Sequence, residues 1–338
     1  MTKLMQLKGY KGWIVTDGSA GAVVQARGIA DALELNYVLK TVTPKGLHRF
    51  FSPWASVSYK ERFGQHGSNF SAPWPSVAIA SGRLSIPYIR AIKRSAGSDC
   101  YTIILQDPKT RADIADLIWV PEHDRRRGKN IITTLTSPHS FSPQRISDLR
   151  ENMTADISAL PSPRVAIMLG GKNSAYKFLE KDYARLELSL TSMGRLGASF
   201  MITSSRRTHR ELLHVVERAT SNTPRILWTG VGYNPYANFL AHAEWLVVTS
   251  DSVNMTGEAC ATGRPVYVFT PSGGTAKFSR FHNALKAYGS TRDLPERFDT
   301  LDDWSYHPLS ASKEIAIEIE KRYECRHKVS TFCKKSLD

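Results

Sequence analysis

The segment that most constrains the fold is WLVVTSDSVNMTGEACATGRPVYVF, in the last third of the chain. Its apolar start, Trp245–Thr249, predicts a buried parallel strand that is followed by a polar loop. A helix is expected to begin near Met255–Thr256 and to end at Gly263, and Val266–Phe269 predicts a second buried strand. A strand, loop, helix and strand in this order form one unit of a parallel α/β sheet.

Polar side chains follow the first of these strands. Open parallel sheets bind ligands beyond the carboxyl ends of their strands. The residues at this edge are Asp251, Ser252, Asn254 and, one helical turn further on, Glu258. Such groups can bind the hydroxyls of a ribose or a sugar next to a phosphate. The same residues are equally suited to capping a structural helix, so both interpretations stay open at this point.

Apolar runs that end in polar clusters recur throughout the first half of the chain. The clusters contain Asp17, Arg83, Asp107 and His123, each shortly after a predicted buried strand. Because the carboxyl ends of parallel strands lie at one edge of the sheet, these side chains are expected to lie near one another. The recurrence is more informative than any single cluster.

The first cluster is a glycine-bearing turn, with Gly18, Ser19 and Gly21 as candidate ligand-binding residues. It joins the predicted strand Trp13–Thr16 to a helix expected over residues 22–35. Glycine in such a turn lets a ligand approach the backbone N–H groups at the helix N-terminus. The turn has neither the dinucleotide pattern GxGxxG nor a P-loop, and a tight structural turn would explain it as well.

The second half contains the better candidate anion site. The loop Gly170-Gly171-Lys172-Asn173-Ser174 follows the predicted strand Val165–Leu169, and its glycines permit close backbone approach while Asn173 and Ser174 add donors. Arg206, after a later strand, can bind a diphosphate bidentately. Together with Glu258 these residues fit a nucleotide-diphosphate sugar. A structural glycine turn and a surface arginine are the alternatives.

Chain breakers divide the sequence into two domains. Leu160-Pro161-Ser162-Pro163 is the strongest break, which predicts an N-terminal domain over residues 1–160 and a C-terminal domain over residues 161–325. The last helix is expected to pack back on the N-terminal domain and to be followed by a basic tail, residues 326–338. Residues 44–75, rich in aromatic residues, serine and proline, predict an irregular or partly helical excursion.

The net charge of +14 implies an anionic partner. Nucleic acid, an acidic membrane surface and phosphorylated substrates all satisfy that requirement. Neither zinc-finger spacing nor an RNA-binding strand motif is present, so nucleic acid is not expected. Solvated surface charge remains an alternative explanation for the basic runs Arg125–Arg127 and Arg206–Arg207.

Other patterns bear on location and cofactors. No uninterrupted apolar run of about 18 residues exists, so a membrane-spanning helix is not expected. The N-terminal stretch MTKLMQLKGYKGW lacks a signal-peptide core, which predicts a cytoplasmic location. The four cysteines show no CxxC spacing, which indicates reduced thiols rather than a metal site. No metal ion or cofactor is expected.

A set of motifs resembles a known family. DGSAGAVVQARGIADAL, QDP, VPEHD, LGGKNSAYKF, SSRRT, NPYANFLAHAEWLVVTSDSVNMTGEACATGRPVYVF and KFSRFHNALKAYG occur in this order between Trp13 and Ile319. Together they resemble the "elongated mitochondria" family of mitochondrial-fission proteins, which includes many bacterial members. That family is similar to GT-B glycosyltransferases, above all in the DSVNMTGEA region, where those enzymes hold a nucleotide-sugar donor.

The two series of strands that end in polar loops predict an α/β fold of two Rossmann-like domains facing a cleft, and the resemblance to GT-B enzymes implies the same fold. It also implies site roles: Glu258 would bind the donor ribose, and Gly170, Gly171 and Ser174 would bind the diphosphate. Lys277 and His282 would lie near the transferred sugar.

The leading hypothesis is a metal-independent glycosyltransferase that moves a sugar from a nucleotide-sugar to an anionic or membrane-linked acceptor. Asp17 is the first candidate for the base that deprotonates the acceptor, followed by His123 and Asp107. The enzyme would then be cytoplasmic or peripheral on the inner face of the membrane. The alternative is a non-catalytic scaffold that recruits partners to a membrane. A sugar-nucleotide epimerase or other dinucleotide enzyme is weaker, because GxGxxG and a YxxxK pair in the required setting are missing.

Overall fold

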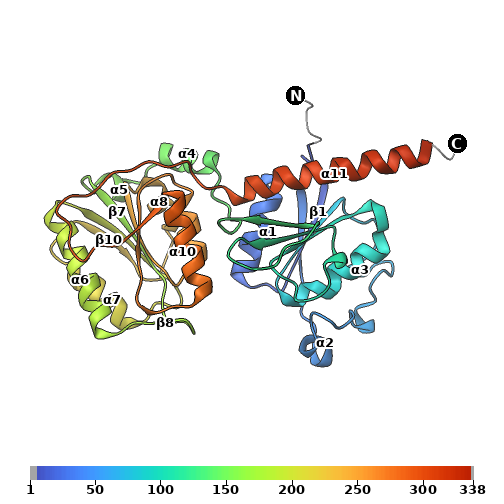
Figure 1. Cartoon of the computed structure of the whole chain (residues 1–338), viewed down its shortest axis with the longest axis horizontal. Helices are drawn as coiled ribbons and strands as arrows, with labels where there is room; N and C mark the ends of the chain where they lie inside the picture. The colour runs from blue at the N-terminus through green and yellow to red at the C-terminus, as the bar shows by residue number, and fades with distance from the viewer. Residues whose placement is uncertain (1–5, 336–338) are drawn as a thin grey trace. The chain divides into compact units, whose positions relative to one another are not determined.

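The computed structural model describes the backbone of residues 6–335 and the side chains of residues 6–327. The chain forms two compact α/β units, each with a parallel sheet between layers of helices (Figure 1). The first unit contains Met1–Ser140 and Ala311–Asp338, and the second contains Phe141–Ser310. The start of the stretch MTKLMQLKGYKGW and the end of the predicted basic tail, residues 336–338, lie outside the described residues.

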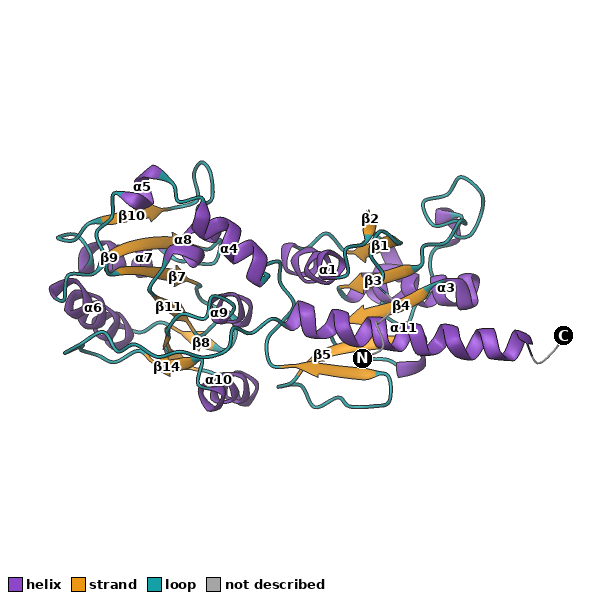
Figure 2. Ribbon diagram, turned by 90° about the horizontal axis from the view of Figure 1, so that it is seen from above, coloured by secondary structure: helices purple, strands orange, loops and turns teal. Residues whose placement is uncertain are grey.

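The sheet of the first unit has the strand order β2-β1-β3-β4-β5-β6, and all its neighbouring strands run parallel (Figure 2). Its strands are β1 (Lys11–Thr16), β2 (Asn36–Thr41), β3 (Val77–Ser81), β4 (Tyr101–Leu105), β5 (Leu117–Pro121) and β6 (Ile131–Thr134). The central strands β3, β4 and β5 are buried along their whole length, as continuous apolar runs predict for a parallel sheet.

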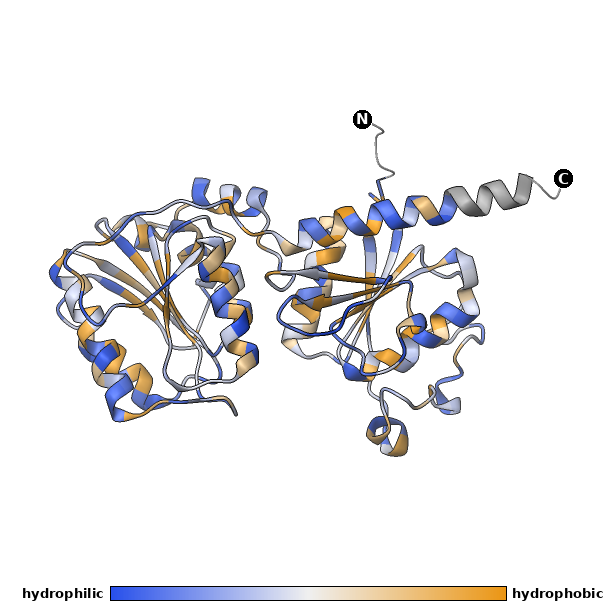
Figure 3. Cartoon of the chain, in the orientation of Figure 1, coloured by the Kyte–Doolittle hydropathy of each residue, from blue (hydrophilic) through white to orange (hydrophobic). Residues whose placement is uncertain are grey.

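Helices cover both faces of this sheet. They are α1 (Ala20–Ala32), α2 (Gly46–Phe50), α3 (Ile86–Ala96) and α11 (Ala311–Lys335), with short 3₁₀ turns η1 (Tyr59–Glu61), η2 (Arg83–Ser85), η3 (Gly97–Asp99) and η4 (Ala112–Ile114). Apolar residues of α1 and α11 form one core with the sheet, and α3 forms a second core on the other face. The apolar positions of both units lie mainly in the strands and on the sheet-facing sides of the helices (Figure 3).

The second unit repeats the plan with the parallel order β10-β9-β7-β11-β12-β14. These strands are β7 (Arg164–Leu169), β9 (Ser199–Ser204), β10 (Arg225–Trp228), β11 (Trp245–Thr249), β12 (Val266–Phe269) and β14 (Thr291–Asp293), and β8 (Tyr176–Lys177) pairs antiparallel with β13 (Ser272–Gly273). The helices are α4 (Pro143–Glu151), α5 (Ala155–Ser158), α6 (Glu180–Arg195), α7 (Arg210–Ala219), α8 (Tyr236–His242), α9 (Val253–Cys260) and α10 (Ala276–Tyr288).

The division between the units differs from the expected break near residue 160. It falls between Ser140 and Phe141, because the following helix, α4, packs on the second unit. The Phe141 ring lies 6.1 Å from the Tyr236 ring, and Arg150 donates hydrogen bonds to the carbonyl oxygens of Ala241 and Thr262. The Pro-Ser-Pro break is therefore a loop inside the second unit, directly before β7.

The C-terminal residues also differ from the expectation. Helix α11 packs against α1 and continues to Lys335, so the predicted basic tail begins inside a helix. Arg326 is held at the first unit by an ion pair of 3.0 Å with Asp116 and by the face of the Tyr101 ring. Within the described part of the chain, no helix is both long and apolar enough to span a bilayer.

Two helices begin earlier than their sequences predict. Helix α1 starts at Ala20 and ends at Ala32, which places Gly21 in its first turn rather than in the preceding loop. Helix α9 starts at Val253, because the Ser252 hydroxyl caps it by accepting from the N–H of Met255 at 3.4 Å. It ends at Cys260 rather than at Gly263.

Gly28 shows how tightly the first unit is packed. A Cβ at Gly28 would lie 2.6 Å from the carbonyl oxygen of His139 and 2.7 Å from its carbonyl carbon, which are backbone atoms that cannot rotate away. Only glycine lets α1 approach the segment at His139 this closely.

We expect Gly28→Ala to lower the free energy of unfolding of the first unit by roughly 1–3 kcal/mol, since the added methyl group overpacks a closed contact. Val24→Ala, at an exposed position of the same helix, is the control and should change stability by less than about 0.5 kcal/mol. Urea unfolding measures both. Equal stabilities for the two variants would contradict the packing described here.

Candidate functional site

Asp251 joins three loops at the carboxyl edge of the second sheet. Its side chain has no exposed surface and directly follows β11 and its polar turn. Its Oδ2 atom accepts from the N–H of Gly171 at 2.9 Å and lies 3.0 Å from Nη2 of Arg207. Asn173 donates from Nδ2 to the Asp251 carbonyl oxygen at 3.3 Å. The predicted residues Asp251, Gly171 and Asn173 are therefore brought together. The buried side chain of Asp251 fixes the positions of the loops after β7 and β9.

The two glycines serve close packing in this structure. The N–H of Gly170 donates to Oγ1 of Thr249 at 2.7 Å, and that of Gly171 donates to Asp251, so both donors already have acceptors. A Cβ at Gly170 would lie 2.3 Å from Oδ1 of Asp251, and one at Gly171 would lie 1.9 Å from the Arg207 carbonyl oxygen. Glycine is needed for the contact between loops rather than to present free N–H groups to a diphosphate.

The two arginines after β9 differ in their contacts. Both the predicted Arg206 and Arg207 are exposed, and Arg207 forms the ion pair with the buried Asp251. Thr208 fixes this loop by donating from Oγ1 to the Gly170 carbonyl oxygen at 2.6 Å. Sequence reasoning missed Arg207 because no periodic pattern tells which of two adjacent loop arginines pairs with a buried carboxylate.

Groups suited to an anion follow three adjacent strands, β9, β7 and β11. They are the exposed residues Arg206 and Ser174 and the N-terminus of α9, where the N–H groups of Val253 and Asn254 have no acceptor within the helix. The aligned peptide dipoles of a helix favour negative charge at this end. Asn254, in the first turn, is half-buried. These donors are separate from the N–H groups of Gly170 and Gly171, which already have acceptors.

Glu258 lies on the same helix, near its C-terminal end, and is buried. The hydroxyl of Tyr236 donates to its Oε2 atom at 2.5 Å. Burial raises the pKa of Glu258 to about 7, although the hydrogen bond from Tyr236 and the charge of Arg145 oppose the rise. Burial and Glu258 together raise the pKa of Tyr236 well above its ordinary value. A carboxyl with a raised pKa thus lies a little more than one turn beyond the N-terminal end of α9.

The two predicted residues on α10 differ in exposure. His282 is buried, and its Nε2 atom lies 2.9 Å from the Ser250 carbonyl oxygen, to which it donates. Burial lowers the pKa of His282, so the ring is neutral at neutral pH and fixes the loop that carries Asp251. Lys277 is exposed near the start of the helix.

In the first unit, Asp17 closes the turn between β1 and α1. Its Oδ1 atom accepts from the N–H of Ser19 at 3.1 Å and from the Ser19 hydroxyl at 2.7 Å. Gly18 has a φ of +80°, which suits glycine. A Cβ at Gly82 would lie 2.6 Å from Oδ2 of Asp17, so the loops after β1 and β3 meet at this carboxylate.

The other two candidate bases differ from Asp17. Burial raises the pKa of Asp107, but hydrogen bonds from Lys109 at 2.8 Å and Arg126 at 2.6 Å outweigh it and hold the pKa below its usual range. A carboxylate held in two ion pairs is a weak base. Asp17 therefore remains a better candidate than Asp107 for the base that deprotonates the acceptor. His123 is buried two residues beyond β5. Among the residues that the structure describes, no three His, Cys, Asp or Glu side chains are grouped so that they could hold a metal ion.

Residues 20–323 match the sequence model of the family described as Mitochondrial fission ELM1. The chain belongs to this family. Mitochondrial fission protein ELM1 from Arabidopsis thaliana is 26% identical over 276 residues, which are 75% of this chain and 65% of that protein. The chain thus spans less than two thirds of the length of this relative. Uncharacterized protein RP120 from Rickettsia prowazekii (strain Madrid E) is 26% identical over 343 residues, which are 90% of this chain and 96% of that protein.

Among solved structures, the UDP-GlcNAc 2-epimerase from Methanocaldococcus jannaschii is similar in fold. It matches with a TM-score of 0.51 at 12% sequence identity and covers 91% of this chain and 99% of that chain. The predicted fold class, two Rossmann-like α/β units of the GT-B kind, is confirmed.

The raised pKa of Glu258 makes stability depend on pH. Between about 4.5, its ordinary pKa, and about 7, the folded chain keeps a proton that the unfolded chain has lost. The free energy of unfolding therefore falls as pH rises through this window. We expect Glu258→Gln to remove this slope and to stabilise the second unit above pH 7 by about 3 kcal/mol at most.

Urea unfolding at a series of pH values between about 5 and 8 measures this effect. Glu180→Gln, which changes an exposed carboxylate of the same unit, should keep the wild-type slope. Parallel profiles for the wild type and Glu258→Gln would show that Glu258 ionises normally.

Proposed function

We propose that the protein is a glycosyltransferase that needs no metal ion and moves a sugar from a nucleotide-diphosphate sugar to an anionic or membrane-linked acceptor. The observation that carries the proposal is the structure of helix α9. Its N-terminus is suited to an anion, and it carries the buried carboxyl of Glu258. A diphosphate and a ribose are joined at about this spacing in one ligand. The similar fold of an enzyme named for UDP-GlcNAc supports the choice of ligand class.

In this proposal the ribose hydroxyls donate to Glu258. The Tyr236 hydroxyl already donates to one oxygen of this carboxyl, which supports the assignment of further hydroxyl donors to it. The diphosphate binds at the N-terminus of α9, with Arg206 and Ser174 as side-chain donors from the neighbouring loops. Asp251 and the two glycines fix the positions of these loops. Lys277, exposed on α10, is assigned to the transferred sugar.

Catalysis would proceed by displacement at the anomeric carbon. The bond from this carbon to the diphosphate oxygen breaks, the diphosphate leaves with the electron pair, and the acceptor oxygen forms the new bond. Asp17 takes the proton of the acceptor hydroxyl. Helix dipole and arginine charge stabilise the negative charge that develops on the leaving diphosphate, which is the work that a metal ion does in other enzymes.

A non-catalytic scaffold at a membrane is the second candidate function. The membership in a family named for mitochondrial fission and the net charge of +14 favour it. A scaffold does not require nucleotide binding at α9, so a nucleotide titration separates the two functions. An epimerase would also bind a nucleotide-sugar, but it would convert the sugar without any acceptor.

Glu258→Gln tests the proposed function directly. Above pH 7, where Glu258 is ionised, the variant keeps the volume and one acceptor oxygen but removes the charge that strengthens the hydrogen bonds from ribose. Such charged hydrogen bonds are worth roughly 1.5–3 kcal/mol, so nucleotide affinity should fall roughly 10- to 100-fold. Calorimetry with UDP, GDP, ADP and CMP measures the affinity of both proteins, and Glu180→Gln should bind as the wild type does. If the wild type binds none of these nucleotides at millimolar concentration, the transferase proposal fails and the scaffold takes its place.

A further inference from the structure

The segment between β2 and β3, residues 42–76, divides its aromatic side chains into two sets. One set, formed by Phe63, Phe70 and Trp74, packs inward. The ring centroid of Phe70 lies 6.0 Å from that of Trp13 and 5.1 Å from that of Tyr88, and Phe63 and Trp74 stack at 5.9 Å. These rings complete the core on the α3 face of the sheet. They account for only part of the segment's apolar side chains.

The second set faces solvent. These side chains are between 51 and 83% exposed, and we call them the apolar face: Leu47, Phe50, Phe51, Trp54 and Tyr59. They lie on α2, in the loop after it and at η1, where the segment extends away from the sheet (Figure 1). Exposed large apolar residues that follow one another closely along the chain in this way are typical of an interaction site.

Hydrogen bonds hold the apolar face in place. Arg90, on α3, donates to the carbonyl oxygens of Trp54 and Ala55. The Ser52 hydroxyl donates to the Arg83 carbonyl oxygen at 2.9 Å, and Tyr88 donates to Oε1 of Glu61 at 2.5 Å. The segment is thus anchored at three points to the elements after β3, and its exposed rings are presented by a fixed backbone.

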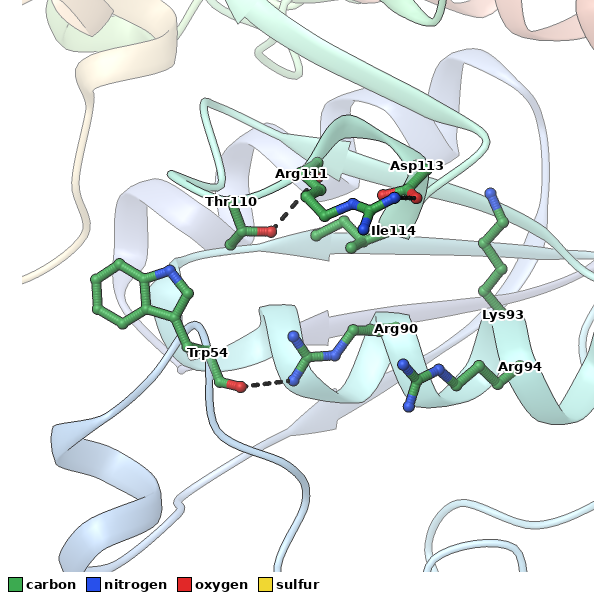
Figure 4. A pocket seen from close by; sticks show the side chains of 8 residues that line it. All are labelled: Trp54, Arg90, Lys93, Arg94, Thr110, Arg111, Asp113 and Ile114. Carbon is green, nitrogen blue, oxygen red and sulfur yellow. Dashed lines mark hydrogen bonds and ion pairs between the residues drawn. The ribbon is translucent and has the colours of Figure 1, made fainter.

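A basic pocket of about 670 Å³ adjoins the apolar face, with Trp54 as part of its wall (Figure 4). Arg90, Lys93, Arg94 and Arg111 line it together with a single acidic residue, Asp113. Arg111 pairs with Asp113 at 2.7 Å and Lys93 pairs with Asp116 at 3.1 Å. Arg94 is exposed. Burial lowers the pKa of Arg90, and repulsion by the charge of Arg94 lowers it further. The pocket therefore keeps a net positive charge.

The sequence around the pocket also has an excess of basic residues. Between residues 43 and 96 the chain has one acidic residue, Glu61, and eight basic ones: Lys45, Arg49, Lys60, Arg62, Arg83, Arg90, Lys93 and Arg94. Aromatic residues between cations match the composition of the interface of an anionic bilayer, where rings lie at the level of the headgroups and lysine and arginine bind lipid phosphates.

We propose that the apolar face and the basic pocket together form a docking surface for an anionic membrane. The aromatic side chains insert between headgroups, and Arg94 with its basic neighbours binds the phosphates. The surface lies at the carboxyl end of β2, next to β1 and its Asp17 loop, since Thr41 of β2 is paired with Thr16. It would thus present a membrane-linked acceptor to the edge that carries Asp17, and this link to catalysis rests on the proposed function.

Sedimentation with vesicles of phosphatidylcholine and phosphatidylglycerol, without nucleotide, tests the docking surface. The triple variant Phe50→Ser/Phe51→Ser/Trp54→Ser should lower the partition coefficient roughly tenfold or more, since most of the inserted apolar area is lost. Arg94→Gln should lower it about fivefold at low salt, because one cation near the anionic surface is lost.

The second unit offers matched controls. Val231→Ser/Tyr233→Ser removes apolar side chains that are 84 and 77% exposed, and Arg195→Gln removes an exposed cation. Both should bind vesicles as the wild type does.

Brominated lipid should quench tryptophan emission in the wild type, and Trp54→Ser should abolish most of that quenching. Circular dichroism verifies that each variant is folded.

Three results would overturn the docking surface: equal binding of the wild type to neutral and anionic vesicles, no binding to either, or full binding by the triple variant. If vesicles do not bind and the triple variant instead lowers the oligomeric state in sedimentation velocity, the apolar face is a protein interface. Nucleotide calorimetry on the triple variant keeps the two proposals separate. If the triple variant loses vesicle binding but keeps nucleotide binding, the result supports the docking surface and does not test the transferase. If vesicles bind but no nucleotide binds, the transferase proposal fails and the docking surface is unaffected.

Discussion

The arrangement of the second unit depends on one buried carboxylate. Asp251 has no contact with solvent, so its charge needs partners inside the protein, and the N–H of Gly171 and the guanidinium of Arg207 provide them. These two partners come from the loops after β7 and β9, while Asp251 itself follows β11. One ion pair and one hydrogen bond thus fix the relative positions of three adjacent strand ends. The glycines follow from the same constraint, because any side chain at Gly170 or Gly171 would collide with Asp251 or with the backbone of Arg207.

This constraint determines which groups remain for a ligand. The Gly171 N–H and Arg207 are engaged by Oδ2 of Asp251, and the Gly170 N–H is engaged by Thr249. Other donors at this edge are the N-terminus of α9, Arg206 and Ser174. The His282 ring strengthens the arrangement by donating to the Ser250 carbonyl oxygen. Glu258, buried further along α9, adds a carboxyl whose protonation changes near neutral pH. Under the proposed function, these groups would bind an anionic group joined to a hydroxyl-bearing ring.

The fold was largely predictable from the sequence, because parallel strands buried on both faces leave continuous apolar runs such as Trp245–Thr249. The resemblance to the mitochondrial-fission family added the GT-B plan, and family and fold are both confirmed. Features that depend on contacts distant in sequence were not predictable. The division at Ser140–Phe141 results from packing of Phe141 on Tyr236, whereas the sequence pointed to a proline break that lies inside the unit. The choice between Arg206 and Arg207, and the split of the aromatic segment into buried and exposed rings, likewise depend on tertiary packing.

Hydrogen exchange of the whole chain, measured with and without UDP, tests the central claim that α9 and the neighbouring strand ends bind a nucleotide. We expect slower exchange in residues 170–174, 204–208 and 250–258, because the ligand would contact these loops and stabilise the helix that carries Glu258. The segment around residues 42–76 should exchange as before. Protection that is absent at millimolar UDP, or that is confined to segments away from these three loops, would contradict the account.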